Sequence, residues 1–200
     1  MTNEVNVSST QERWTLDDIT ALFDGVFGQR YQTRLIRGGD EPLYRPATSE
    51  IPYHQVIFAR GYYASALHEI SHWCIAGEKR RHLEDYGYWY CPDGRDAEQQ
   101  KAFEKAEIAP QALESIFTKA CGRQFHVSVD NLGGDVEVDI EAFAARVEAR
   151  AQRYLEEGLP ARASAFKEAL ELFYGHQETL NQAVTQGWAV LDQANLVISD

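Results

Sequence analysis

The stretch ALHEISHWC, residues 66–74, contains the spacing His-Glu-x-x-His. Positions four apart stand one above the other on the same face of a helix, so His68 and His72 can direct their imidazoles at one ion. Imidazole nitrogens bind divalent metals at about 2.0–2.1 Å. Glu69 lies one step around the helix and can face the same site. We therefore predict a metal site here, with Glu69 as a candidate catalytic residue.

Two histidines need a third ligand. One zinc peptidase type places a third histidine ten residues after the first, but that position is Glu78 in this chain. A second peptidase type takes a glutamate from a later helix, which Glu98 or Glu104 can supply. Nearer candidates follow Gly77, which we expect to end the helix as a left-handed cap and to let the chain fold back toward the histidines. These nearer candidates are Glu78, His82, Glu84 and Asp85.

The identity of the metal depends on that third ligand. A carboxylate would complete the set of two histidines and one acid that is typical of Fe(II) with open positions, whereas His82 would give three nitrogen ligands. In a zinc peptidase, Glu69 would be the base that activates a metal-bound water. A metal-dependent ribonuclease and a binding module with a structural metal are further alternatives. The residue types alone do not choose between zinc and iron.

Charge and composition limit the kinds of partner that the protein is expected to bind. The net charge of −12 disfavours binding to free nucleic acid, because a phosphate backbone is repelled on average. No apolar run approaches the roughly 20 residues that cross a bilayer, and the N-terminus lacks the layout of a secretion signal. Three widely spaced cysteines without a Cys-x-x-Cys motif favour a reduced, cytoplasmic setting. We therefore expect a cytoplasmic protein without a membrane or free nucleic acid partner.

The hydrophobic pattern predicts an α+β fold: a single helix-rich domain with a small sheet and a metal site on a central helix. Thr15 is placed to cap the first helix, Pro110 to separate two helices within residues 97–121, and Gly122 to end the second of these. Further helices are expected at 62–76, 139–157 and 160–174, extended segments at 31–36, 56–59 and 125–129, and a loop at 38–46. Residues 1–13 are expected to be a disordered leader, 14–175 the domain, and 176–200 a C-terminal helical extension.

Two longer motifs point to a family. HEISHWCIAG (68–77), followed by DYGYWYCPDGRD (85–96), resembles the elongation factor P hydroxylases of bacteria. PQALESIF (110–117) and FHVSVDNLGGD (125–135) give weaker support. Together these motifs span most of residues 15–175, and the tail beyond Tyr174 is not covered.

The resemblance implies an activity. Members of this family hydroxylate a lysine of the translation factor after that lysine has received a β-lysyl group, as the last step of its modification. The partner would be β-lysylated elongation factor P, and the hydroxyl goes onto the protein's own lysine. The family's fold is similar to that of a small metal-dependent bacterial ribonuclease, and its site resembles those of non-haem iron enzymes. A zinc-dependent peptidase of the His-Glu-x-x-His type is the main alternative.

The resemblance also implies roles for individual residues. His68 and His72 look like the family's paired ligands for Fe(II) or another divalent metal, and Asp85 is favoured as the third ligand over His82. Glu69 would then orient a ligand or a bound water. A channel for the cationic lysine arm is expected to involve Tyr86, Tyr88, Trp89, Asp93 and Arg95. Core packing of these rings, and an internal ion pair of Arg95 with Asp93 or Asp96, are the competing interpretations. The co-substrate is not indicated.

Overall fold

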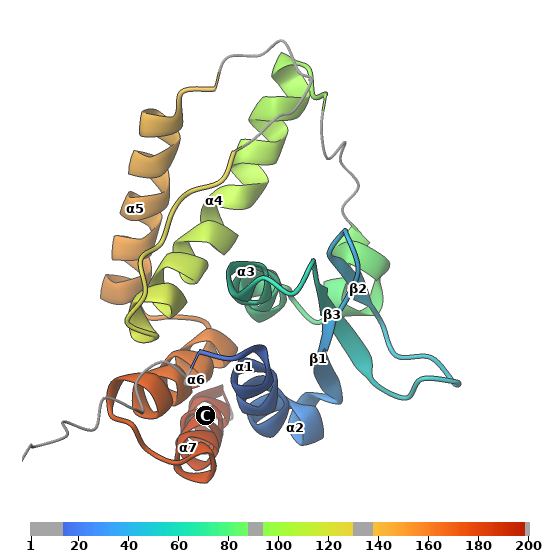
Figure 1. Cartoon of the computed structure of the whole chain (residues 1–200), viewed down its shortest axis with the longest axis vertical. Coiled ribbons are helices and arrows are strands. Elements are labelled where there is room, and N and C mark those ends of the chain that lie inside the picture. The colour runs from blue at the N-terminus through green and yellow to red at the C-terminus, as the bar shows by residue number, and fades with distance from the viewer. Residues whose placement is uncertain (1–13, 88–93, 130–137, 199–200) are drawn as a thin grey trace, which may run out of the picture.

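A small sheet lies on one side of the molecule and helices make up the rest (Figure 1). The computed structural model describes residues 14–87, 94–129 and 138–198, with the side chains of 197 and 198 left out. The sheet has the strand order β1-β3-β2. Strand β1 (Thr33–Arg37) is parallel to β3 (His54–Phe58), and β2 (Leu43–Arg45) is antiparallel to β3. The disordered leader that we predict over residues 1–13 lies outside the described residues.

One face of the sheet packs against the helices. The register places Leu35 and Tyr44 on either side of Val56, and all three side chains are buried. Strand β2 corrects our expectation of a loop over residues 38–46. It is short and lies at an edge between Pro42 and Pro46, where the missing proline N–H groups interrupt no central ladder.

The chain enters this core through helix α1 (Leu16–Phe23). Thr15 caps it as predicted, and its hydroxyl accepts from the backbone N–H of Asp18 at 3.1 Å. The helix continues as a π-helical turn, η1 (Asp24–Gly28), and a last short turn, α2 (Gln29–Tyr31). Its buried side chains are Ile19, Leu22, Phe23, Val26 and Phe27.

Helix α3 (Tyr63–Ile75), seen end-on near the centre of Figure 1, contacts β3, α4 and α6. Trp73 is fully buried, and its ring centroid lies 5.3 Å from that of Phe23 and 4.7 Å from that of Phe27. Such aromatic contacts contribute about 0.5–1.5 kcal/mol each beyond their buried area. The helix that carries the two histidines is therefore fixed in the core.

The end of α3 differs from the expected glycine cap. Ala76 is extended, with φ −63° and ψ 119°, and Gly77 is not among the residues with positive φ. Arg81 and Arg162 instead donate to the carbonyl of Ala76. Two 3₁₀ turns follow, η2 (Arg80–His82) and η3 (Glu84–Gly87).

Helix α4 (Ala97–Ala120) is a single helix with Pro110 inside it, which corrects our division into two helices. A proline only removes one i→i−4 hydrogen bond and bends the helix when packing holds both halves in place. Gly122, at φ +69°, ends α4 as predicted. The expected strand at 125–129 is not formed, because Ser128 pairs with the side chain of Gln111 rather than with a neighbouring strand.

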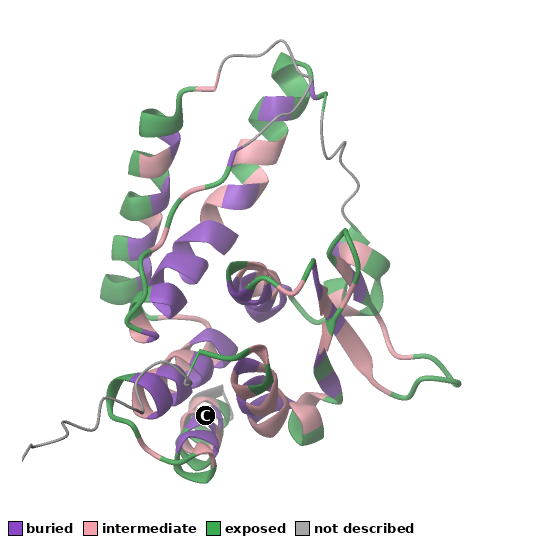
Figure 2. Ribbon diagram, viewed as in Figure 1, coloured by how far each residue is buried: buried purple, intermediate pink, exposed green. Residues whose placement is uncertain are grey.

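Three further helices complete the described fold. Helix α5 (Ile140–Glu157) packs along α4, as Figure 1 shows, and α6 (Ala161–Leu170) continues into the π-helical turn η4 (Glu171–Gly175). Helix α7 (Leu180–Ile198) packs on α6 and α1 through buried Ala183, Val184 and Leu191. Figure 2 shows the buried residues on the inward faces of these helices. The predicted fold class is confirmed, and no described helix has the length and apolar character to cross a membrane.

Candidate metal centre

His68 and His72 face the same point from adjacent turns of α3. Their Nε2 atoms lie 3.1 Å apart, and their ring planes are inclined by 72°. Neither ring is packed away in the core, since the two side chains keep 26% and 12% of their surface exposed. The helical spacing therefore brings both imidazoles to one site, as predicted.

The third member of the site is Glu107, on α4. One of its carboxylate oxygens lies 3.3 Å from Nε2 of His68, and the other lies 3.3 Å from Nε2 of His72. Among the described residues, His68, His72 and Glu107 are the side chains of metal-binding type whose ligand atoms gather within 4.8 Å of one another. Sequence reasoning looked for a glutamate on a later helix but did not consider this one.

These distances suit a divalent ion. Two ligand atoms at about 2.1 Å from a metal are about 3.0 Å apart at an octahedral angle and about 3.4 Å apart at a tetrahedral angle. The 3.1 Å between the two Nε2 atoms falls between these limits, and so does the 3.3 Å between each imidazole and the nearer oxygen of Glu107. The three groups occupy one side of the site, which is the arrangement of two histidines and one carboxylate that leaves positions for other ligands.

Charge also favours a cation here. The side chain of Glu107 is 3% exposed, and burial alone would raise its pKa, but His72 and His68 outweigh burial and lower the pKa to about 2. Burial likewise lowers the pKa of His68, while Glu107 and Glu114 raise it to about 10. A buried carboxylate of this kind needs a positive partner, and a divalent ion meets that need as well as a protonated imidazole does.

A second carboxylate on α4 orients His68. Nδ1 of His68 lies 2.8 Å from Oε2 of Glu114. When Nδ1 carries the proton and donates to Glu114, the lone pair of Nε2 points at the site. A metal-binding histidine commonly makes such a contact to a carboxylate.

Helix α4 presents a whole row of polar groups to α3. Glu107, Gln111 and Glu114 are spaced i, i+4 and i+7, so they lie on one face of the helix. Gln111 donates to Glu107 at 3.4 Å and exchanges two hydrogen bonds with the backbone of Ser128, at 2.7 and 3.0 Å. The segment after α4 is thereby tied to the same helix face that supplies the third ligand.

Comparisons with known proteins point to one family. A family model described as elongation factor P hydroxylase matches residues 22–184. A protein of Haemophilus influenzae named elongation factor P lysine hydroxylase is 50% identical over 168 residues, which are 84% of this chain and 94% of that protein. The chain belongs to the elongation factor P hydroxylase family.

Asp85 and His82, the predicted third ligands, do not converge with His68 and His72. Oδ1 of Asp85 accepts a hydrogen bond from the backbone N–H of Tyr44 at 2.8 Å, which ties the turn after α3 to strand β2. His82 is exposed, and its ring lies 6.1 Å from that of His54. Neither residue belongs to the described group of converging ligand atoms, and Glu78 and Glu84 are exposed.

Glu69 lies beside the metal site of this family member without joining the three converging groups. Burial raises the pKa of its carboxyl group above the ordinary value, and the neighbouring His68 and His72 act in the opposite direction. Glu107 and Asp85 are close enough to raise it further. The carboxyl group of Glu69 therefore lies close to the three candidate ligands.

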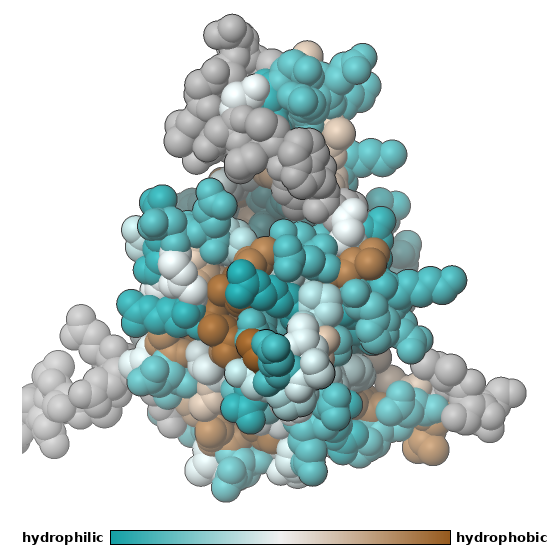
Figure 3. All heavy atoms as spheres, turned by 90° about the vertical axis from the view of Figure 1, so that its right-hand side faces the viewer, coloured by the Kyte–Doolittle hydropathy of each residue, from teal (hydrophilic) through white to brown (hydrophobic). Residues whose placement is uncertain are grey.

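A cavity of about 560 Å³ opens next to His72. Ile75, Ala76 and Pro110 give it an apolar wall, and Tyr86 also lines it. The remaining lining residues are Gly77, Glu78, Lys79, Arg80 and Ala106. Figure 3 shows the side of the molecule that carries the sheet, where hydrophobic residues gather near the middle of a mainly hydrophilic surface.

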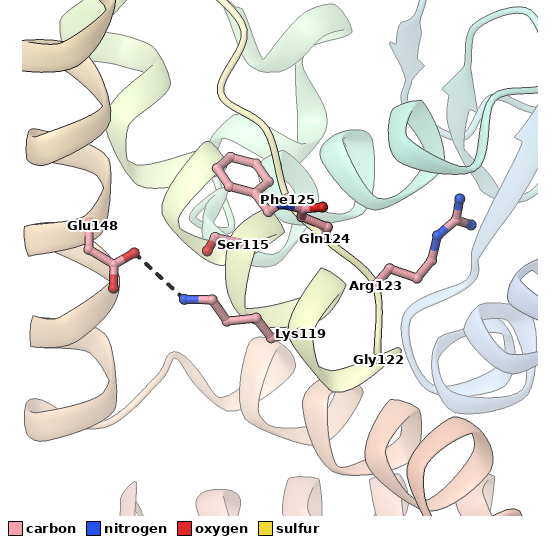
Figure 4. A pocket seen from close by; sticks show the side chains of 7 residues that line it. All are labelled: Ser115, Lys119, Gly122, Arg123, Gln124, Phe125 and Glu148. Carbon is pink, nitrogen blue, oxygen red and sulfur yellow. Dashed lines mark ion pairs between the residues drawn. The ribbon is translucent and has the colours of Figure 1, made fainter.

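A second cavity, of about 500 Å³, lies on the opposite side of α4 from α3, away from the candidate metal ligands (Figure 4). Lys119 and Glu148 point toward each other across it and form an ion pair at 3.6 Å. Ser115, Gln124 and Phe125 also line it, whereas Arg123 points away from this pair. Its lining contains none of the three converging ligands.

The predicted substrate-binding residues are only partly within the described structure. Tyr86 lines the cavity beside His72, while Tyr88, Trp89 and Asp93 lie outside the described residues. Arg95 is 1% exposed. Its Nε donates to Gln100 at 2.8 Å, and its guanidinium lies 3.8 Å from the ring centroid of Phe103. The side chain of Arg95 therefore packs against the first turns of α4.

Proposed function

We propose that this protein hydroxylates the β-lysyl-modified lysine of elongation factor P and depends on Fe(II) held by His68, His72 and Glu107. Membership of the family supports the reaction and the protein substrate. The convergence of two imidazoles and one carboxylate is the observation that supports the metal. Glu107 takes the place that we first gave to Asp85.

Hydroxylation of an unactivated C–H bond requires chemistry that no side chain provides, and a redox metal supplies it when bound. The chain contributes position. Glu114 fixes the tautomer of His68, and Gln111 holds Glu107 in place. Glu69 orients a water or another group at the site, which is the role that we propose for it instead of a hydrolytic base.

The substrate and its setting follow from the same proposal. The arm of a modified lysine is long and cationic, and the cavity beside His72 offers an apolar wall for its methylene groups. A translation factor as partner implies a cytoplasmic reaction, in keeping with the buried free thiols of Cys74 and Cys121. Free nucleic acid is not the expected ligand of a chain with a net charge of −12.

The decisive experiment uses anaerobically purified protein. Elemental analysis should find iron, and co-expression with elongation factor P and its β-lysylation enzymes should add the mass of one oxygen atom to the factor. His68→Ala should abolish both the bound iron and the mass gain. Unchanged activity of the His68→Ala variant would contradict the role of the metal.

A zinc peptidase remains the competing function, because a glutamate on a second helix is also how one peptidase type completes its site. Glu69→Gln separates the two functions. A peptidase loses its general base in this variant and stops cleaving peptides. In our proposal no peptide is cleaved by the wild type, and Glu69→Gln retains the iron but hydroxylates more slowly.

A further inference from the structure

Tyr86 combines three features that a residue of the core rarely shows together. Its side chain is buried, with 5% of its surface exposed, and it lines the cavity beside His72. Its hydroxyl has no hydrogen-bond partner among the described residues. Its backbone is left-handed, with φ 59° and ψ 18°. An orphan hydroxyl inside a protein calls for an explanation, and a bound ligand is one.

The left-handed backbone is held in place on several sides. Asp85, the preceding residue, is also left-handed, at φ 46°, and two such residues in succession without glycine are unfavourable. Asp85 accepts from the N–H of Tyr44, and Arg80 donates to the carbonyl of Tyr86 at 3.0 Å. The N–H of Tyr86 donates to the carbonyl of Leu83 at 3.0 Å. A strained backbone conformation that neighbouring contacts hold in place is characteristic of functional sites.

The turn directs the ring of Tyr86 between strand β2 and the metal centre. The ring is stacked on that of Tyr44, with centroids 4.3 Å apart, and it is nearly parallel to the imidazole of His72, at 6.4 Å and 10°. These ring contacts hold the side chain of Tyr86 in place. Its position beside His72 is therefore a fixed property of the fold.

The cavity wall contains a second oxygen that can accept a hydrogen bond from a ligand. Pro110 has no N–H, so the carbonyl of Ala106 lacks its regular helical partner, and both residues line the cavity. Two oxygens that can accept hydrogen bonds, the hydroxyl of Tyr86 and the carbonyl of Ala106, thus belong to residues that line the cavity beside its apolar wall. Lys79 and Arg80 also line the cavity, and both residues are exposed, so solvent screens their charge.

We infer that the hydroxyl of Tyr86 is a substrate-positioning group, which accepts a hydrogen bond from an N–H group of the lysine arm when that arm lies in the cavity beside His72. The inference rests on the proposed function. The methylene groups of the arm lie along Ile75, Ala76 and Pro110, and the N–H groups meet the oxygen acceptors. Tyr86 thereby fixes which carbon of the lysine faces the metal.

Tyr86→Phe removes only the hydroxyl, and Tyr44→Phe is the matched control. The hydroxyl of Tyr44 belongs to the same stack but donates to the carbonyl of Arg81 at 2.7 Å and does not line the cavity. Binding is measured with zinc-loaded protein and β-lysylated elongation factor P, so that no turnover occurs. Loss of a hydrogen bond to a charged group should raise the dissociation constant about tenfold in Tyr86→Phe, and Tyr44→Phe should bind like the wild type.

Two more measurements separate positioning from structure. Fragmentation mass spectrometry of the iron-loaded reaction should show the hydroxyl spread over more than one lysine carbon in Tyr86→Phe. Metal content should be equal in all variants, and only Tyr44→Phe should lower the unfolding temperature.

If wild type hydroxylates the factor while Tyr86→Phe binds it equally and modifies the same carbon, the inference is wrong and the proposed function stands. A loss of stability in Tyr86→Phe as large as in Tyr44→Phe would also overturn it. Failure of the wild type to hydroxylate would reject the proposed function itself.

Discussion

Oε2 of Glu114 lies 2.8 Å from Nδ1 of His68, and Glu114 stands two helical turns after Glu107 on the same face of α4. One helix therefore supplies both a candidate ligand and the group that orients a candidate ligand on another helix. The geometry of the metal centre depends on how α3 and α4 pack, and changes in α4 are expected to act on metal binding.

The first prediction concerns Glu114→Gln. The amide keeps the size of the side chain but loses the charge that strengthens the contact to Nδ1 of His68. We expect metal affinity to fall about 10–100-fold with little change in fold, as measured by competition with a chelator. Glu104→Gln is the control, because Glu104 lies on the same helix but pairs with Arg146 outside the metal centre. Its metal affinity should stay within about twofold of the wild type, as expected when a partly exposed ion pair is lost. Equal affinities for both variants would contradict the role of Glu114.

The second prediction separates Glu107 from Asp85 as third ligand. Glu107→Gln should purify without stoichiometric metal, because a neutral amide is a poor ligand and leaves the two histidines without their carboxylate. Asp85→Asn should retain the metal and lose less than about 1 kcal/mol of stability, because asparagine tolerates the left-handed backbone and can still accept from Tyr44. Elemental analysis and urea unfolding check both variants. The reverse result would restore Asp85 as the ligand.

The two histidines could be predicted because their relationship is local. A spacing of four residues determines that both rings share a helix face, wherever that helix is placed in the fold. The cap at Thr15 and the left-handed Gly122 are local in the same sense, and the structure confirms both. The fold class followed from such local patterns together.

Glu107 could not be found in the same way, because its relationship to His68 depends on the packing of α4 against α3. Our expectation that Pro110 ends a helix also divided α4 next to Glu107, which concealed the row formed with Gln111 and Glu114. That row was the available signal: three polar residues at i, i+4 and i+7, the last two of them among the apolar residues Ala112, Leu113, Ile116 and Phe117. A continuous helix would have pointed to a polar partner facing it.

The third prediction concerns Arg162, a buried cation at the end of α3. Its Nη2 donates to the carbonyls of Cys74 and Ala76, and its guanidinium lies 4.5 Å from the ring centroid of Trp73. Arg162→Met should lower the free energy of unfolding by about 1–3 kcal/mol, because the carbonyl of Cys74 is left without this donor in a buried place. Urea unfolding measures this effect. Arg153→Met, on the exposed side of α5, should change stability by less than about 0.5 kcal/mol. A loss in Arg162→Met no larger than in the control would show that the cap is dispensable.

The fourth prediction tests whether α7 is part of the core. A Cβ at Gly25 would lie 2.5 Å from Cγ2 of Val184 on α7, whereas a Cβ at Gly28, in the same π-helical turn, would meet nothing closer than 3.9 Å. Both substitutions by alanine remove the flexibility of glycine in the unfolded chain, so only the contact with α7 differs. Gly25→Ala should cost about 1–3 kcal/mol through overpacking, while Gly28→Ala should be neutral or stabilising. Adding Val184→Ala to Gly25→Ala should recover part of the loss, as a double-mutant cycle by urea unfolding measures. If Gly25→Ala and Gly28→Ala were equally stable, α7 would not pack tightly on η1, and residues 176–200 would be a helical extension outside the domain, as the sequence predicts.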